Sequence, residues 1–242
     1  MDPRDVITAI AAPTADIGAA AYFHPDTLAR GKELGLDGFR FYFLGRGGVL
    51  GDVEPEVVVS AFGYFEPSLV AKMWNTGKER IAPRAAAREY LACNADLGRA
   101  KFDGLDGLDA YCEAASAVVG AADLAGLTLF AGVRGEPVPD DPPAAAIHYA
   151  VLLRELRGST HLLAVRASGL SAALAHAVRR PDDVAAFGHG EPPEITDDDR
   201  AALVRAEELT DELLAPAFSV LDDGAADALV AGTRAMHAAL SG

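Results

Sequence analysis

The chain has 242 residues, half of them hydrophobic, and its 21 Lys and Arg against 36 Asp and Glu leave a formal net charge of −15. The length fits one or two domains. No apolar run reaches the roughly 18 residues of a membrane span, no basic start leads into an apolar secretory stretch, and Cys93 and Cys112 have no metal or redox spacing. We therefore expect a cytoplasmic globular protein, and its acidity opposes general binding to phosphate backbones, which depends on Lys and Arg.

The first part of the chain predicts a series of helices. Ala, Leu, Glu and Arg dominate, and strand-type alternation of apolar and polar residues is almost absent, so we expect a nearly all-α protein. Pro and Gly residues mark most of the expected ends. Pro13, for example, ends the first helix. The expected helices cover about residues 5–12, 26–35, 37–47, 55–65, 67–74, 83–97 and 108–124.

A boundary follows at residues 132–143, which hold four prolines and two glycines. It divides the chain into an N-terminal half, residues 1–135, and a C-terminal half, residues 136–242. The second half predicts helices over about 144–157, 161–167, 171–179, 181–188, 197–213 and 225–240, with Gly158 interrupting the first pair and Pro216 disturbing the fifth. Each half contains an apolar helix, a Gly-containing turn and a second helix, which is the shape of a helix-turn-helix pair. Any two consecutive helices with a glycine turn share this shape, so a duplicated unit stays open.

The segment 148–161 is rich in groups that can exchange protons or bind anions. His148 and Glu155 are seven residues apart and share one helix face, while Arg154, Arg157 and His161 lie along another stripe if the helix continues past Gly158. A His and a Glu on one face can act as an acid–base pair, and an Arg can hold a ligand carboxylate through two hydrogen bonds. The alternative is that these residues form ordinary ion pairs on the helix surface.

A second segment combines aromatic residues with one arginine. Four of the five residues 39–43 are aromatic, which predicts a buried helix, and Arg46 follows Tyr42 by one turn. With Phe65, and with His24 as a loop contact, these side chains suggest an aromatic-lined pocket whose polar anchor is Arg46. The alternative is an aromatic core in which Arg46 bridges two helices through Glu54, Glu66 or backbone carbonyls.

Several kinds of site have no sequence signal. Paired Cys motifs, His triplets and the H-E-x-x-H motif of zinc enzymes are absent, so we expect no metal site. Phosphate loops, dinucleotide fingerprints and the G-x-S-x-G elbow are absent too, and the sequence implies no cofactor.

Short motifs along most of the chain resemble a family of mostly actinobacterial proteins of helix-turn-helix or MarR-like (winged-helix) type. This resemblance implies an all-α fold of two helical halves related to tandem winged-helix units, with the second half degenerate. It implies fold more than function. The matching motifs are Tyr22-Phe23-x-Pro25-Asp26, Tyr42-Phe43-x-x-Arg46 with Leu50-Gly51, Phe62-x-x-Phe65-x-Pro67, Leu153-Arg154-Glu155-x-Arg157-Gly158-x-x-His161, Gly169-Leu170 and Glu208-x-Thr210-Asp211.

The sequence departs from that family in the regions that would read DNA. The piece between Val178 and Thr196 is short, acidic and proline-rich, whereas family members have a longer stretch that forms a helix and a wing. A recognition helix needs Arg, Lys, Asn or Gln, but the candidate in the first half begins Asp52-Val53-Glu54-Pro55-Glu56. The candidate in the second half offers only Arg179 and Arg180.

We therefore expect a helical protein that binds a small organic molecule and has lost DNA binding, with no membrane partner. Tyr42, Arg46, Phe65, Arg154, Arg157 and His24 would bind the ligand. One alternative is an enzyme of natural-product tailoring, with His161 or His148 as general acid or base and Glu155 orienting it. Another is a ligand-responsive transcription regulator, a class that is usually dimeric through its terminal helices, which leaves a homodimer open.

Overall fold

The computed structural model describes residues 1–191 and 193–241, and within them the chain forms twelve α-helices and no strand. About 74% of the chain is helical, which confirms the all-α prediction. The helices are α1 (Pro3–Ala19), α2 (Pro25–Glu33), α3 (Gly38–Gly47), α4 (Pro55–Phe62), α5 (Pro67–Lys78), α6 (Pro83–Phe102), α7 (Leu108–Ala121), α8 (Thr128–Arg134), α9 (Pro142–Ala167), α10 (Ala172–Arg179), α11 (Asp197–Phe218) and α12 (Asp223–Ser241), with 3₁₀ turns η1 (Gly48–Leu50) and η2 (Pro181–Asp183).

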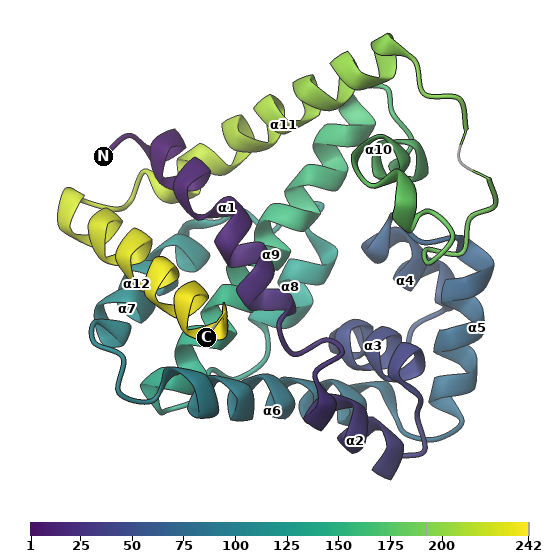
Figure 1. The fold of residues 1–242 in the computed structure, drawn as a ribbon, viewed down its shortest axis with the longest axis horizontal. Helices are drawn as coiled ribbons and strands as arrows, with labels where there is room; N and C mark the ends of the chain where they lie inside the picture. The colour runs from purple at the N-terminus through teal and green to yellow at the C-terminus, as the bar shows by residue number, and fades with distance from the viewer. Residues whose placement is uncertain (192, 242) are drawn as a thin grey trace.

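Helix α9 runs through the middle of the molecule, with α1, α7 and α12 on one side and α3, α4 and α5 on the other (Figure 1). It begins at Pro142 because the Asp141 side chain accepts a hydrogen bond from the Ala144 N–H and prolines suit the first turn. Buried residues of α9 occur around its whole circumference, as expected for a helix that packs against neighbours on every side. Its 26 residues supply one wall of the site described below.

The predicted break of this helix at Gly158 is wrong. Helix α9 continues from Pro142 to Ala167 without interruption. Glycine in a helix costs only about 0.5–1 kcal/mol relative to alanine. Leu156 before it and Ala164 and Val165 after it are buried, so the burial of both segments outweighs that cost.

The predicted end of the first helix at Pro13 is also wrong. Helix α1 continues to Ala19 because Thr14, Ile17 and Gly18, beyond the proline, are buried against neighbouring helices. Proline removes one helical hydrogen bond, and the burial of the last turn compensates for it.

Two further local expectations differ from the structure. A helix that the sequence did not predict, α8, extends into the start of the proline-rich boundary region, and its Leu129, Phe130 and Val133 are buried. The short helix expected over 181–188 is only the 3₁₀ turn Pro181–Asp183 followed by turns.

The larger hydrophobic cluster contains residues from both expected halves, for example Phe43 and Trp74 from the first and Ile147 and Phe218 from the second. A smaller cluster joins the end of α9 to α10 and α11. The division at residues 135 and 136, and the descent of both halves from one unit, stay predictions.

Candidate functional site

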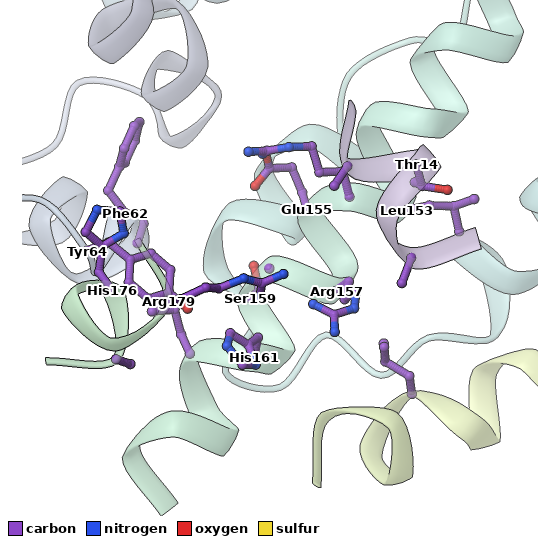
Figure 2. A pocket seen from close by; sticks show the side chains of 18 of the residues that line it. Thr14, Phe62, Tyr64, Leu153, Glu155, Arg157, Ser159, His161, His176 and Arg179 are labelled. Carbon is purple, nitrogen blue, oxygen red and sulfur yellow. The ribbon is translucent and has the colours of Figure 1, made fainter. Parts of the chain in front are cut away.

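A cavity of about 260 Å³ lies where α1, α3, α4, α9, α10 and α11 meet. In Figure 2, Phe62, Tyr64 and His176 lie on one side of it, and Glu155, Arg157 and His161 lie on the other. Seven of the residues expected from the sequence to form a site line this cavity: Tyr42, Arg46, Phe65, Arg154, Glu155, Arg157 and His161.

Glu155 is the most buried charged side chain of the cavity wall, with 2% of its side chain exposed. Arg46 holds it through two hydrogen bonds, Nε to Oε1 at 2.9 Å and Nη2 to Oε2 at 2.8 Å. Arg154 Nη1 donates to Oε1 at 2.8 Å. Burial raises the pKa of the Glu155 carboxyl, but the two arginines more than offset this and hold its pKa below the usual range. Glu155 is therefore an anion at neutral pH.

Aromatic rings surround Arg46. Its guanidinium carbon lies 4.6 Å from the Phe62 ring centre, and its Nη1 donates to the Tyr42 hydroxyl at 2.9 Å. Phe65 stacks on Phe187, with ring centres 4.1 Å apart. Arg46 bridges two helices, α3 and α9, but its partner is Glu155 and not the expected Glu54 or Glu66. It also lines a cavity, as the other alternative for this segment expected.

A second polar cluster surrounds His161. The Glu207 carboxylate, from α11, accepts hydrogen bonds from Arg157 Nη2 at 2.6 Å and Arg179 Nη1 at 2.8 Å, and its Oε1 lies 3.7 Å from His161 Nε2. Burial lowers the pKa of His161, Glu207 raises it, and the two arginines lower it; on balance this pKa lies below its ordinary value. His161 is thus mainly neutral at pH 7.

The partner of the other ring nitrogen determines the tautomer of His161. Thr210 Oγ1 lies 2.6 Å from the Ala206 carbonyl oxygen, so its single hydroxyl proton is donated there. The hydroxyl oxygen therefore accepts from His161 Nδ1, 2.9 Å away. In the neutral ring the lone pair is then on Nε2, which can accept a proton.

Two of the predicted site residues lie outside the cavity lining. His148 is 4% exposed, and burial lowers its pKa to about 4. His24 is the N-cap of α2 and accepts a hydrogen bond from the Asp26 N–H. The hydrogen bonds of the Glu155 carboxylate are made with Tyr22, Arg46 and Arg154 within the described chain, so the expected pairing of His148 with Glu155 stays a prediction.

Sequence reasoning missed several residues of the site: Tyr22, Arg179, His176, Glu207 and Thr210. Two of them had a signal, because Tyr22 and Thr210 belong to motifs quoted above. Glu207 had none, and Arg179 was considered only as a DNA contact, since the roles of both arise only when α10 and α11 pack against α9.

In the described part of the chain, no three His, Cys, Asp or Glu side chains are grouped in a way that could hold a metal ion. Over the same residues, each helix is too short or too polar to cross a bilayer.

Comparison with known proteins identifies the family of the chain. No curated protein and no solved structure matches the chain. A model of the helix-turn-helix family matches residues 8–192, about three quarters of the chain, from α1 to the segment after α10. The protein therefore belongs to this helix-turn-helix family.

Proposed function

We propose that this protein binds a small organic molecule in the cavity between α1, α3, α4, α9, α10 and α11. The observation that carries the proposal is a cluster of three bonded charged residues, Arg46, Glu155 and Arg154, in the wall of a cavity that is also lined by aromatic rings. Burying three charged groups costs several kcal/mol per ion unless their hydrogen bonds are satisfied. A cavity with few polar anchors and an apolar wall is the usual form of a small-molecule site.

We also propose that the helix-turn-helix scaffold has lost general DNA binding. Helix α4 begins between Glu54 and Glu56, and Asp52 lies just before it, so its N-terminal end repels phosphates. In α10, the guanidinium of Arg179 is bound to Glu207 at the cavity. The candidate recognition helices therefore offer few free cations for a DNA backbone.

Filling the cavity tests the binding proposal without breaking an ion pair. Gly158 lines the cavity, and a Cβ added there meets no atom within 4 Å. Gly158→Leu adds a side chain to the cavity and also improves helix propensity. Gly120→Leu is the matched control, because Gly120 is an exposed glycine of α7 with equally open space around its Cβ.

The measurement is saturation-transfer NMR with a mixed set of small acids, amines and neutral compounds, combined with native mass spectrometry. We expect binders whose signals disappear in Gly158→Leu and persist in Gly120→Leu, with both variants as stable as the parent. If no compound of any charge shows this dependence on Gly158, the binding proposal is wrong.

A second candidate function is proton-transfer catalysis, favoured by the tautomer of His161. With Nδ1 donating to Thr210, the lone pair on Nε2 can take a proton from a bound molecule. A ligand identified in the binding assay, incubated in D₂O, should then exchange a carbon-bound proton for deuterium. Exchange that continues at the same rate in His161→Gln would exclude this function.

A further inference from the structure

The cavity has a local charge opposite to that of the whole protein. Among the described residues that line it are five arginines, Arg46, Arg154, Arg157, Arg179 and Arg180, and one carboxylate, Glu155. Arginines still outnumber carboxylates when Glu207 and Asp183, which pair with lining arginines, are included. The chain as a whole has a net charge of −15. A positive cavity in an acidic protein attracts an anion and disfavours a cation.

The arginines differ in how many of their N–H groups have acceptors. Each nitrogen of the Arg46 guanidinium bonds to Glu155 or Tyr42. By contrast, Arg154 donates only through Nη1, to Glu155, and Arg157 donates only through Nη2, to Glu207, among the described residues. The Nε atoms of Arg154 and Arg157 are both buried and have no hydrogen-bond partner within residues 1–191 and 193–241.

An unpaired buried N–H of a charged group is costly, because the group has lost its water without gaining an acceptor. Arg154 and Arg157 are three residues apart on α9 and both line the cavity, so their side chains are neighbours on one helix surface. Arg154 Nη2 and Arg157 Nη1 also have no acceptor among the described residues, and unlike the two Nε atoms they are not fully buried, so a carboxylate in the cavity can accept from them.

The surroundings favour a monoanion with an apolar body. Glu155 and Glu207 already neutralise part of the positive charge of these arginines, so the second charge of a dianion, such as a phosphate monoester, would gain less than the first. On the opposite side of the cavity, Phe62 and Tyr64 present aromatic surface (Figure 2). The volume of about 260 Å³ lies just below the range of drug-sized pockets, which limits the body to one or two rings.

From these observations we infer that the ligand is a small carboxylic acid with a flat apolar body, whose carboxylate is held by Arg154 and Arg157. This inference rests on the proposed function, since it names the ligand class of the same cavity.

The test compares matched pairs of compounds by isothermal titration calorimetry. Benzoate, phenylacetate, cinnamate and indole-3-acetate are each paired with the corresponding primary amide, which has the same shape and no charge. We expect at least one acid to bind about tenfold or more tightly than its amide, the ratio that corresponds to a hydrogen-bonded charge. We also expect this preference to weaken as salt is added.

Variants locate the carboxylate. Arg154→Gln and Arg157→Gln should each weaken binding of the acid by about tenfold and leave binding of the amide unchanged. Arg157→Lys keeps the charge opposite Glu207 but loses the planar donors, and it should weaken binding of the acid as well. Arg166→Gln is the control, because Arg166 is an exposed arginine of the same helix outside the cavity lining.

The outcomes separate this inference from the proposed function. If amides or amines bind as well as acids and their binding depends on Gly158, the cavity binds ligands but the carboxylate inference is wrong. If the acid still binds more tightly than its amide in Arg154→Gln, Arg157→Gln and Arg157→Lys, the assignment of the carboxylate to Arg154 and Arg157 is wrong. If no compound shows binding that depends on Gly158, the proposed function itself fails.

Discussion

His148 shows how burial alone removes a titratable residue from acid–base chemistry near neutral pH. Its side chain is 4% exposed, and its Nε2 has no hydrogen-bond partner among the residues the structure describes. Burial lowers its pKa from 6.5 to about 4, because the charged ring would lose its hydration without gaining a counter-ion. At pH 7 the ring is neutral and lies outside the cavity, so it contributes to packing in the protein interior.

The same burial makes the stability of the protein depend on pH. Between pH 6.5 and 4 the unfolded chain binds a proton at His148 that the folded chain does not, so stability falls as the pH drops through this window. At pH 5 the contribution of this residue is a loss of about 2 kcal/mol. His148→Leu removes the titrating group and should lose correspondingly less stability between pH 7 and pH 5.

Urea unfolding of the parent and of His148→Leu at both pH values measures this difference. A variant whose free energy of unfolding falls by as much as that of the parent would show that His148 is protonated in the folded state.

At this scale the sequence predicted much of the site. Arg154, Arg157 and His161 are spaced by three and four residues, so they share one stripe provided that the helix continues past Gly158. Helix α9 does continue there, and all three residues line the cavity. The partners of that stripe could not be predicted, because Glu207 and Thr210 are about fifty residues away in the chain. Their contacts depend on how α11 packs against α9, which no local pattern specifies.

At the scale of elements, a glycine determines how closely α1 approaches α9. A Cβ at Gly18 would lie 2.8 Å from Arg154 Cδ and 3.1 Å from the Ala150 carbonyl oxygen. This close approach keeps the Arg154 side chain beside Tyr22, whose ring centre is 4.9 Å from its guanidinium carbon. The packing of α1 therefore helps to direct Arg154 toward Glu155.

We expect Gly18→Ala to destabilise the protein by about 1–3 kcal/mol, the usual cost of overpacking, although alanine is the better helix former. Gly120→Ala should instead stabilise it by about 0.5–1 kcal/mol, since Gly120 is exposed and its Cβ would meet open space. Denaturant unfolding of the two variants gives both numbers. Equal stabilisation by both substitutions would mean that α1 moves away from α9 at little cost.

The sequence predicted most helices but not the continuity of three of them, α1, α9 and α11. Helix α11, expected to be disturbed at Pro216, runs through it to Phe218. The errors at Pro13 and Gly158 have one cause: residues that break an isolated helix are tolerated where the segments on both sides are buried. Helix α8 was missed because the prolines and glycines around it suggested a linker. Local signals gave helix starts, for example those of α4, α5 and α6 at Pro55, Pro67 and Pro83, more reliably than the interior of the longest helices.

At the scale of the whole molecule, the cavity extends beyond the part that matches the family model. The match ends at residue 192, whereas α11 begins at Asp197 and supplies Leu214 and Phe218 to the cavity wall and Thr210 and Glu207 to His161. The proposed ligand site therefore combines the shared helix-turn-helix region with a helix outside it. Ligand preference can then differ between members that share residues 8–192.

The net charge of the whole chain also determines how strongly it can bind DNA. Binding to duplex DNA releases counter-ions in proportion to the phosphates neutralised by Lys and Arg, so it strengthens steeply at low salt. A chain of net charge −15, with acidic residues at the start of α4 and Arg179 bound to Glu207, lacks that driving force. We therefore expect no retardation of random-sequence duplex DNA in a mobility-shift assay at about 50 mM salt, a concentration at which even non-specific DNA-binding proteins stay bound to the duplex.

Substitution of the acidic residues should not be enough to create binding, because the remaining charge of the chain still repels the duplex. Glu54→Gln and Glu56→Gln together should leave the DNA unretarded. A retarded complex with the parent protein that dissociates as salt rises toward about 200 mM would contradict the loss of DNA binding and favour the ligand-responsive regulator. In that case, addition of a ligand that depends on Gly158 should change the affinity for DNA, because two ligands that bind different conformations of one protein are coupled reciprocally.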